Sequence, residues 1–445
     1  MSFIVRHPCE LKAVGAEVFR AACSMKWVRR ALGDVDQRRR IYDATTTWLI
    51  FLGQVLSPDR SCRNALAQAR TAELIGAKAS VHTGAYCQAR ERLPEDVLHT
   101  VAMGLGAELT HAERAQDRWQ GRRVIVSDGS SVSMPDTLAN QAEYPQPSAQ
   151  AAGCGFPVMY LVALMSLASG ALLDFATGGG SGNELPLWRK LWSLLRPGDI
   201  ALGDRLYCGY ADLAMLRMRG VDVLVRLGKR KTDFRKGIAF GVLDHLTAWH
   251  CPKKSPTWLG SQPLPATITV RELRFRVEVP GYRAETVTLV TTLTDAELYT
   301  KDDLADLFFQ RWQVELRLRD IKTMLGMNVL RTTTPSRVRK ELWMYLAGYN
   351  ILRTLMNTAA QKADVPVARI SFQGCRQRLI AAATNAGPAR NFKRLYRRMI
   401  RDIAKDQNPE RPNRIEPRAV KRRPKQYDLL NKPREVLQKQ LLGAA

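Results

Sequence analysis

Apolar positions along this chain follow two different periods, and the change between them separates helical from strand-rich stretches. Residues 1–115 show mainly the helical period, with long apolar runs interrupted by polar breaks. The expected helices lie at 43–56 (buried), 60–75 (amphipathic) and 86–93 (basic). This pattern predicts a helical N-terminal domain over residues 1–115. Its many arginines are compatible with a DNA-binding face and equally with solvated helix surfaces.

From residue 122 the pattern changes to short apolar runs separated by turn residues. The expected order is strand, strand, strand, helix, strand, helix, strand. These elements lie at 122–134, twice within 156–176, and at 184–195, 199–207, 210–220 and 221–227. We expect the first strand to end near Asp128 in a Gly/Ser turn, and the fourth to end at Asp204. Such an order is typical of an α/β layer with a mixed sheet, whose first part we place at 116–227.

The stretch from Gly155 to Leu173 has no charged residue and is about as long as a membrane span. It also contains Pro157, a turn signal at Ser169-Gly170, and runs of β-favouring residues. Two buried strands joined by a tight turn explain these features better than a membrane helix, so we expect no membrane association.

Residues 228–300 begin with a charged loop and continue with alternating strands, which predicts a β-rich insertion. The pattern then returns to helices, at 304–325 and 341–360, in a second part of the core over 301–365. The last region, 366–445, is basic. Its segment 411–425 holds three prolines and seven Lys or Arg, so we expect an extended basic tail or a disordered basic appendage there.

Charge narrows the class of partner. The 445 residues carry a formal net charge of +26, and 45% of them are hydrophobic, which is enough for real cores. So large a positive excess is usually balanced by a polyanion, and nucleic acid is the leading choice. The eight cysteines form no Cys-x-x-Cys pair and the six histidines do not cluster near them. A zinc site and a disulfide scaffold are therefore both disfavoured, and a reducing cytoplasm fits best.

One face of the helix at 304–325 carries an aromatic ring, a guanidinium, a carboxylate and an ammonium. At about 100° per residue, Glu315, Lys322 and Phe308 fall roughly 40°, 20° and 60° from Arg311. A carboxylate between two cations suits a metal-bound phosphate, although a solvated charged face gives the same spacing.

Two further acids, Asp128 and Asp204, follow apolar runs at the ends of predicted strands. Ligands of open α/β sheets bind at this edge. If the strands are neighbours, both carboxylates face one volume, which Glu315 can complete. Mutual repulsion would be removed by two Mg²⁺ ions, which activate a water or a 3′-hydroxyl for attack on a phosphodiester. Taken singly, Asp128 is also compatible with a turn or helix cap, and Asp204 with a local ion pair.

These motifs resemble a known family. The spacing Arg311, Glu315, Lys322 within QRWQVELRLRDIKTMLGM resembles the Tyr–Arg–Glu–Lys signature of bacterial insertion-sequence transposases of the IS-four family. The segments VSDGSSVSMPD and LGDRLYCGYADL are similar to those around that family's first and second catalytic acids. The resemblance covers roughly residues 45–435. It departs from the family at Phe308, which replaces the signature Tyr.

The resemblance implies a DDE enzyme with a ribonuclease-H-like core, in which Asp128, Asp204 and Glu315 bind Mg²⁺, or Mn²⁺ in its place. It also implies that Arg311, Lys322 and the ring of Phe308 contact DNA phosphates at the cleaved end. Relatives use a Trp in the insertion to stabilise a flipped base, and Trp249 and Trp258 are the candidates for this role here. Either of them can instead be a core or surface Trp.

The sequence therefore predicts a cut-and-paste DNA transposase. Its expected partners are double-stranded DNA, as transposon inverted repeats and as target, and a second copy of the chain in a synaptic homodimer. We expect it in the bacterial cytoplasm, associated with the nucleoid. Two alternatives stay open: a metal-dependent nuclease without strand transfer, and a domesticated, catalytically silent DNA-binding protein.

Overall fold

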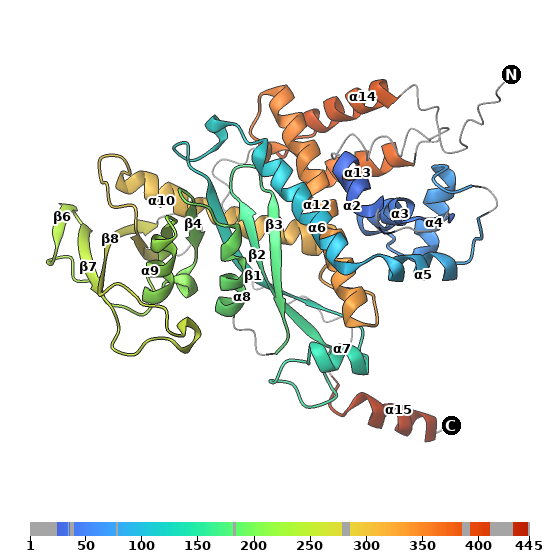
Figure 1. Cartoon of the computed structure of the whole chain (residues 1–445), viewed down its shortest axis with the longest axis horizontal. Coiled ribbons are helices and arrows are strands. Elements are labelled where there is room, and N and C mark those ends of the chain that lie inside the picture. The colour runs from blue at the N-terminus through green and yellow to red at the C-terminus, as the bar shows by residue number, and fades with distance from the viewer. Residues whose placement is uncertain are drawn as a thin grey trace. The chain divides into compact units, whose positions relative to one another are not determined.

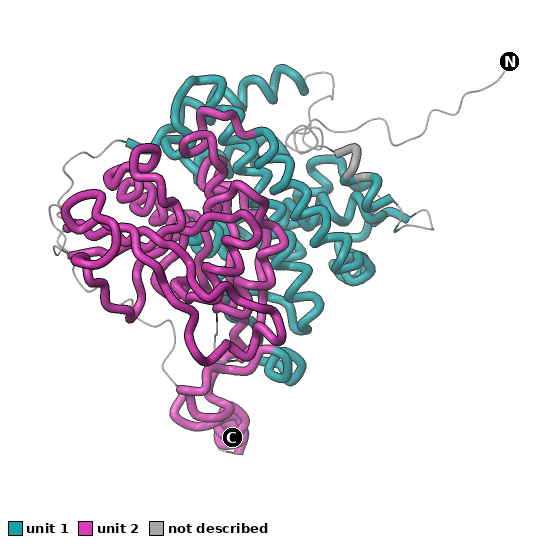
Figure 2. Tube along the Cα trace, turned by 60° about the vertical axis from the view of Figure 1, so that its left-hand side comes forward, with its two compact units in different colours: residues 1–112, 132–143, 318–409 teal, residues 113–131, 144–317, 410–445 magenta. Residues whose placement is uncertain are grey.

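The computed structural model describes residues 25–33, 35, 40–76, 79–180, 184–277, 285–384, 392–409 and 430–443. The chain forms two compact units, each assembled from segments far apart in sequence (Figure 2). Unit 1 comprises Met1–Ala112, Val132–Glu143 and Leu318–Pro409, and unit 2 comprises Glu113–Ser131, Tyr144–Arg317 and Glu410–Ala445. The five-part division drawn from the sequence stays a prediction.

The described part of unit 1 is largely helical. Its α-helices are α2 (Met25–Gly33), α3 (Ala44–Leu56), α4 (Cys62–Thr71), α5 (Gly84–Arg92), α6 (Glu95–His111), α7 (Leu138–Glu143), α12 (Pro335–Ala363), α13 (Phe372–Ala383) and α14 (Phe392–Lys405). The apolar α12 packs against α3, α6, α13 and α14, because its side chains are buried on almost every turn. The helices predicted at 43–56 and 341–360 are confirmed, and Asp43 caps the first of them by accepting a hydrogen bond from the Thr46 N–H.

A nine-stranded mixed sheet forms the centre of unit 2, as the sequence pattern predicts for the core strands. The strands are β1 (Val124–Ser133, ending in unit 1), β2 (Val158–Ser166), β3 (Leu172–Gly178), β4 (Ile200–Gly203), β5 (Asp222–Arg226), β6 (Ile238–Gly241), β7 (Asp244–His250), β8 (Thr267–Val277) and β9 (Glu285–Thr291). Their order is β3-β2-β1-β4-β5-β9-β8-β7-β6. The β1–β4 and β4–β5 pairs are parallel, and β9 joins β5 in the antiparallel sense. The strands of the predicted β-rich insertion thus extend the same sheet.

Unit 2 also contains short helices, of which α11 has its last two residues in unit 1. They are α8 (Glu184–Lys190), the 3₁₀ turns at Leu191–Leu194 and Arg205–Tyr207, α9 (Tyr210–Met218), α10 (Lys301–Gln310), α11 (Trp312–Arg319) and α15 (Arg434–Gly443). Figure 1 shows α8 lying against β2 and β3, which it also contacts. The helix predicted at 184–195 is shorter than expected, because α8 ends at Lys190 and a 3₁₀ turn follows it.

The uncharged stretch forms a hairpin, as predicted. Strands β2 and β3 pair antiparallel from Tyr160 opposite Gly178, and Gly170 takes a positive φ of 73° in the turn between them. Among the described residues, no helix is both long and apolar enough to cross a membrane. The basic segment 411–425 lies outside the described residues.

Candidate active site

Asp128 lies on β1, and Asp204 directly follows β4, the parallel strand beside it. In the β1–β4 pair, Val126 is opposite Leu202, and Asp128 and Asp204 each come two residues after this pair. The prediction that the first strand ends near Asp128 is wrong, because β1 continues to Ser133. It is β4 that ends here, and Asp204 follows it as the cap of a 3₁₀ turn, accepting a hydrogen bond of 2.7 Å from the Leu206 N–H.

Asp128 is half-buried and surrounded by charge. Its Oδ1 accepts a hydrogen bond of 3.0 Å from the Gly129 N–H. Burial raises the pKa of Asp128 to about 6, the positive charge of Arg311 opposes this rise, and the negative charges of Glu315 and Glu184 add to it. The structure therefore brings Glu315, from a distant helix, into the electrostatic surroundings of Asp128.

Arg311 provides the positive charge beside these acids. It connects α10 to α11, and its Nη2 lies 3.2 Å from Oε1 of Glu315. Its guanidinium carbon is 5.7 Å from the ring centre of Phe308, which is only 9% exposed. The Nε atom of Arg311 is buried and has no hydrogen-bond partner. The guanidinium thus balances two carboxylates and keeps one donor unused.

The helix predicted at 304–325 is less regular than expected, and this affects Lys322. It is divided at Arg311 into α10 and α11, and its last part, Asp320–Met324, is a π-helix. A π-helix has more residues per turn than an α-helix, so the α-helical angle calculated for Lys322 does not apply. Lys322 also belongs to unit 1, whereas Glu315 belongs to unit 2.

A fourth acid, Glu184, was missed by the sequence reasoning. It is the first residue of α8, and its carboxylate packs against the Cα atom of Gly129: a Cβ built on that glycine would lie 2.2 Å from Glu184 Cδ. Burial raises the pKa of Glu184, and the charge of Asp204 raises it further. An acid after the glycine-rich run GGGSGN gives no sequence signal for a site, since helix starts often carry acids.

Tyr207 marks the common surroundings of three of these acids. It is 1% exposed. Burial is the main cause of the raised pKa of its phenol, and three acids add to that rise, namely Glu184, Asp128 and Asp204. The described residues contain no three His, Cys, Asp or Glu side chains close enough to hold one metal ion. The acids are therefore electrostatic neighbours without forming a closed ligand set.

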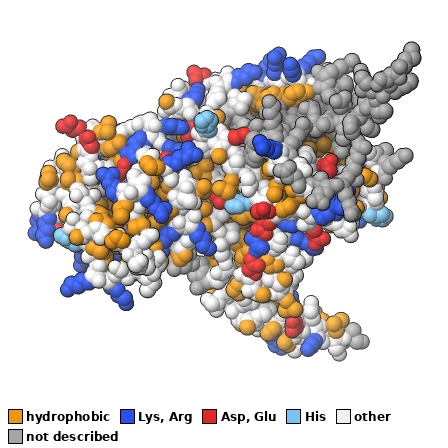
Figure 3. Space-filling model, in the orientation of Figure 1, with side chains coloured by type: hydrophobic (Ala, Val, Ile, Leu, Met, Phe, Trp, Pro, Cys, Tyr) orange, Lys and Arg blue, Asp and Glu red, His pale blue; other side chains and the backbone are white. Residues whose placement is uncertain are grey.

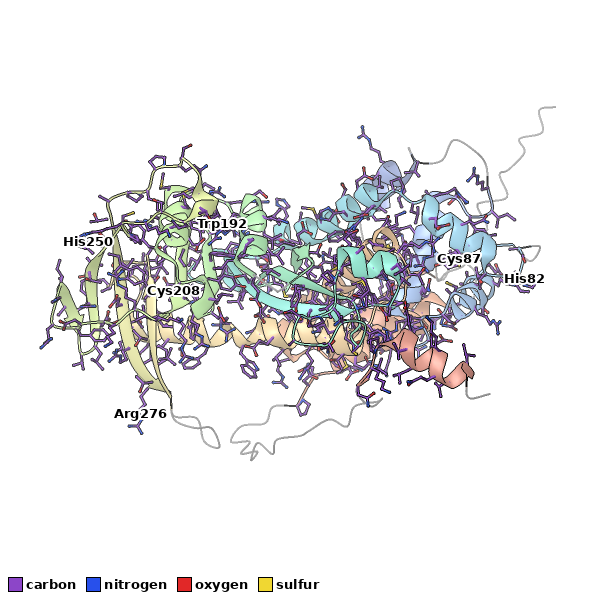
Figure 4. The ribbon with its side chains drawn as sticks, turned by 90° about the horizontal axis from the view of Figure 1, so that it is seen from below. His82, Cys87, Trp192, Cys208, His250 and Arg276 are labelled. Carbon is purple, nitrogen blue, oxygen red and sulfur yellow. The ribbon has the colours of Figure 1, made fainter. Side chains whose placement is uncertain are left out.

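The two tryptophans predicted for base stacking have different surroundings. Trp249 on β7 is 3% exposed, its Nε1 donates a hydrogen bond of 2.7 Å to Glu272, and Arg230 lies 4.5 Å from its ring centre. Trp258 is 37% exposed and lies beneath Arg189, 3.9 Å from its ring centre. Its edge meets Trp192, which Figure 4 labels. Of the two, only Trp258 presents an accessible ring.

The chain is similar to several proteins named as transposases. The family model described as "Transposase DDE domain" matches residues 119–351. The chain is 28% identical over 376 residues to the transposase InsG for insertion sequence element IS4 of Escherichia coli (strain K12), covering 80% of each chain. It is 30% identical over 115 residues to the transposase for insertion sequence element IS231D of Bacillus thuringiensis subsp. finitimus, covering 26% of this chain and 23% of that one.

A solved structure, the piggyBac transposase synaptic complex with hairpin DNA, aligns at a TM-score of 0.44 and 11% identity, covering 89% of this chain and 86% of that one. The matched region, residues 119–351, includes all four acids and Arg311. The chain therefore belongs to the DDE transposases, in the insertion-sequence IS4 family that its Arg311–Glu315–Lys322 spacing resembles.

Proposed function

We propose that this transposase cleaves phosphodiester bonds at the inverted-repeat ends of its transposon and joins the freed 3′-hydroxyl ends to target DNA. The observation that carries the proposal is the placement of Asp128 on β1 and of Asp204 directly after the parallel strand β4 beside it, with the charge of Glu315 reaching Asp128. In unit 2 the charges of Glu315 and Glu184 thus act on Asp128, and the charge of Asp204 acts on Glu184.

The residues present fit a hard divalent cation. Their donors are all carboxylate oxygens, which Mg²⁺ and Mn²⁺ prefer. Burial raises the pKa of Asp128, and the negative charges of Glu315 and Glu184 raise it further, so a bound cation would stabilise the charged carboxylate. Asp128, Asp204 and Glu315 would hold the ions, with Glu184 as a further acid facing them. When bound, a pair of such ions activates a water or 3′-hydroxyl and stabilises the leaving oxygen.

The basic residues near Glu315 would position DNA. Arg311 has one unused buried donor, Nε, and a partly exposed ion pair, so its guanidinium can exchange a carboxylate oxygen for a phosphate oxygen. Lys322 and the ring of Phe308 would contact phosphates near the same end. Trp258, as the accessible tryptophan, would stack on a base flipped out beside the cleavage site.

The strand order supports a ribonuclease-H-like core. Strands β3-β2-β1-β4-β5 form one side of the sheet, with β1, β4 and β5 parallel. We assign the core to 116–227 and 301–365, the β-rich insertion to 228–300, and DNA contacts to the helical N-terminal region and the basic C-terminal region. We further propose a synaptic homodimer at the bacterial nucleoid.

Helix α14 in unit 1 offers a surface for the DNA backbone. Its exposed basic side chains are Lys393, Arg394, Arg397, Arg398, Arg401 and Lys405, while Met399, Ile400 and Ile403 are buried beneath them. A row of basic side chains is visible at the upper edge of Figure 3, where Figure 1 places α14. Contacts of this kind fix position on DNA without reading its sequence.

Incubation of the protein with Mg²⁺, transposon-end DNA and a target plasmid tests the proposal. We expect cleaved ends and joined products from the wild type, and neither from Asp128→Asn or Glu315→Gln. The matched control is Asp306→Asn, which removes an exposed carboxylate of α10 and should leave both steps unchanged. Cleavage without joining would favour the nuclease alternative. Full activity of Asp128→Asn would show that the site is wrongly assigned.

A further inference from the structure

Unit 1 contains a cavity of about 270 Å³ that the transposase mechanism above does not use. Residues from α3, α4, α5, α12 and two connecting segments line it. Its basic side chains are Arg60, Arg90, Arg331, Arg337 and Lys340, and its acids are Glu91 and Glu341. Cys87, which also lines it, lies on α5 and is labelled in Figure 4. Positive charge therefore exceeds negative charge around the cavity.

Both acids of the cavity already have partners. Glu91 forms an ion pair with Arg337, and its backbone carbonyl accepts a hydrogen bond of 2.8 Å from Lys340. Glu341 is 5% exposed and accepts a hydrogen bond of 3.0 Å from the Arg331 N–H. The positive charges of Arg90 and Arg60 also act on Glu341, although neither guanidinium lies within ion-pair distance of its carboxylate.

Arg60, Arg90 and Arg331 have no carboxylate within 4 Å among the described residues. Arg60 donates to the Tyr345 hydroxyl at 3.2 Å and to the backbone carbonyl of Gly326. Arg90 lies 3.8 Å from the ring centre of Phe51, and its buried Nε has no hydrogen-bond partner. The guanidinium of Arg331 makes no ion pair and no hydrogen bond in the described part of the chain.

The electrostatic state of Lys340 agrees with this excess. Burial lowers its pKa, Glu95 opposes that change, and the positive charges of Arg337 and Arg90 lower the pKa further. Guanidinium groups recognise phosphate oxygens through paired, charge-assisted hydrogen bonds, which gain strength away from bulk water. An anion in the cavity would supply the charge that its own acids do not.

The volume of the cavity is large enough for a ligand bigger than a single inorganic ion. It is close to the lower end of small-molecule sites, which is about 300 Å³. We propose that this cavity binds the phosphate of a nucleotide unit, held by Arg331 and Arg90 with Arg60 beside them. The nucleotide can belong to a DNA strand or be free in solution, and the chemistry of recognition is the same. This site is independent of the proposed catalytic acids.

Binding of a deoxynucleoside monophosphate to the full-length protein tests the proposal, measured by calorimetry. We expect saturable binding that weakens at least tenfold in Arg331→Gln, about 1.4 kcal/mol. The control, Arg63→Gln, removes an exposed charge of α4 that does not line the cavity, and this variant should bind like the wild type. Absence of binding in the wild type, or equal weakening in both variants, would overturn the proposal.

Alkylation of Cys62, read by peptide mass spectrometry, gives a second measurement that does not depend on activity. Cys62 lines the cavity, and its Sγ lies 3.5 Å from Nη1 of Arg90. The nucleotide should slow its alkylation in the wild type and not in Arg331→Gln, whereas unchanged alkylation at saturating nucleotide contradicts the proposal. Competition between transposon-end DNA and the nucleotide would identify a DNA strand as the source. Simultaneous binding of both would identify a free nucleotide.

Discussion

Replacement of Gly129 by Ala tests whether Glu184 belongs to the catalytic centre. The added Cβ would lie 2.2 Å from Glu184 Cδ and 2.3 Å and 2.4 Å from its two oxygens. Ordinary contacts between carbon atoms are about 3.5 Å or longer, so the carboxylate must retreat by more than about 1 Å. The atoms that clash are at the flexible end of the Glu184 side chain, so the carboxylate can move while the backbone of β1 stays in place.

The effects on stability and on activity should differ in size. Moving one side chain off its preferred rotamer costs about 0.5–1.5 kcal/mol, so a small decrease in the free energy of unfolding is expected. Displacing a group of the active site by about 1 Å can lower the rate by roughly 100-fold. We therefore expect Gly129→Ala to lower the single-turnover rate of end cleavage by about that factor while remaining folded.

A double-mutant cycle separates this explanation from general damage to β1. Glu184→Ala alone should lower the cleavage rate by a similar factor, and adding Gly129→Ala to it should cause little further loss, because the clash is gone. Cleavage rates and chemical denaturation are measured for all four proteins. If Gly129→Ala cleaves within twofold of the wild type, or if the two losses multiply, the added Cβ does not act on the cleavage rate through Glu184.

Three further predictions concern DNA contacts and the tryptophans. Trp249→Ala should lower the free energy of unfolding by about 3–5 kcal/mol in denaturant titrations, because it removes a buried ring. Trp258→Ala should leave the free energy of unfolding unchanged and slow end cleavage. The opposite pattern would reverse the assignment of the two tryptophans. Phe308→Tyr should strengthen binding to transposon ends by about 0.5–1.5 kcal/mol if the hydroxyl reaches a phosphate, and unchanged binding in a filter assay would refute this. Neutralising Arg397 and Arg398 together should make the slope of log affinity against log salt shallower by about 2, and an unchanged slope would exclude α14 as a DNA contact.

The sequence predicted those elements of the fold in which apolar residues follow one another in a buried position. Strands β2 and β3 were predictable because their long apolar runs are broken by a single Ser-Gly turn. Helix α12 was predictable because it is apolar over most of its length. In both cases burial alone determines the pattern.

Features set by partners distant in sequence were not predictable. The strand β1 continues beyond Asp128 because Ser133 exchanges backbone hydrogen bonds with Asn328 and Leu330. The π-helix that changes the geometry of Lys322 leaves no mark in the hydrophobic period. Glu184 was missed for a similar reason, since only the folded chain places it against Gly129.

Cleavage of the polypeptide by bound Fe²⁺ tests the central claim most directly. With Fe²⁺ replacing Mg²⁺ in the complex with transposon-end DNA, ascorbate and peroxide generate radicals that cut the backbone close to the ion. Mass spectrometry then maps the cuts. The account predicts cuts near Asp128, Asp204 and Glu315 together, all suppressed by excess Mg²⁺ and by Asp128→Asn. Cuts near only one of these residues, or cuts elsewhere in the chain, would contradict it.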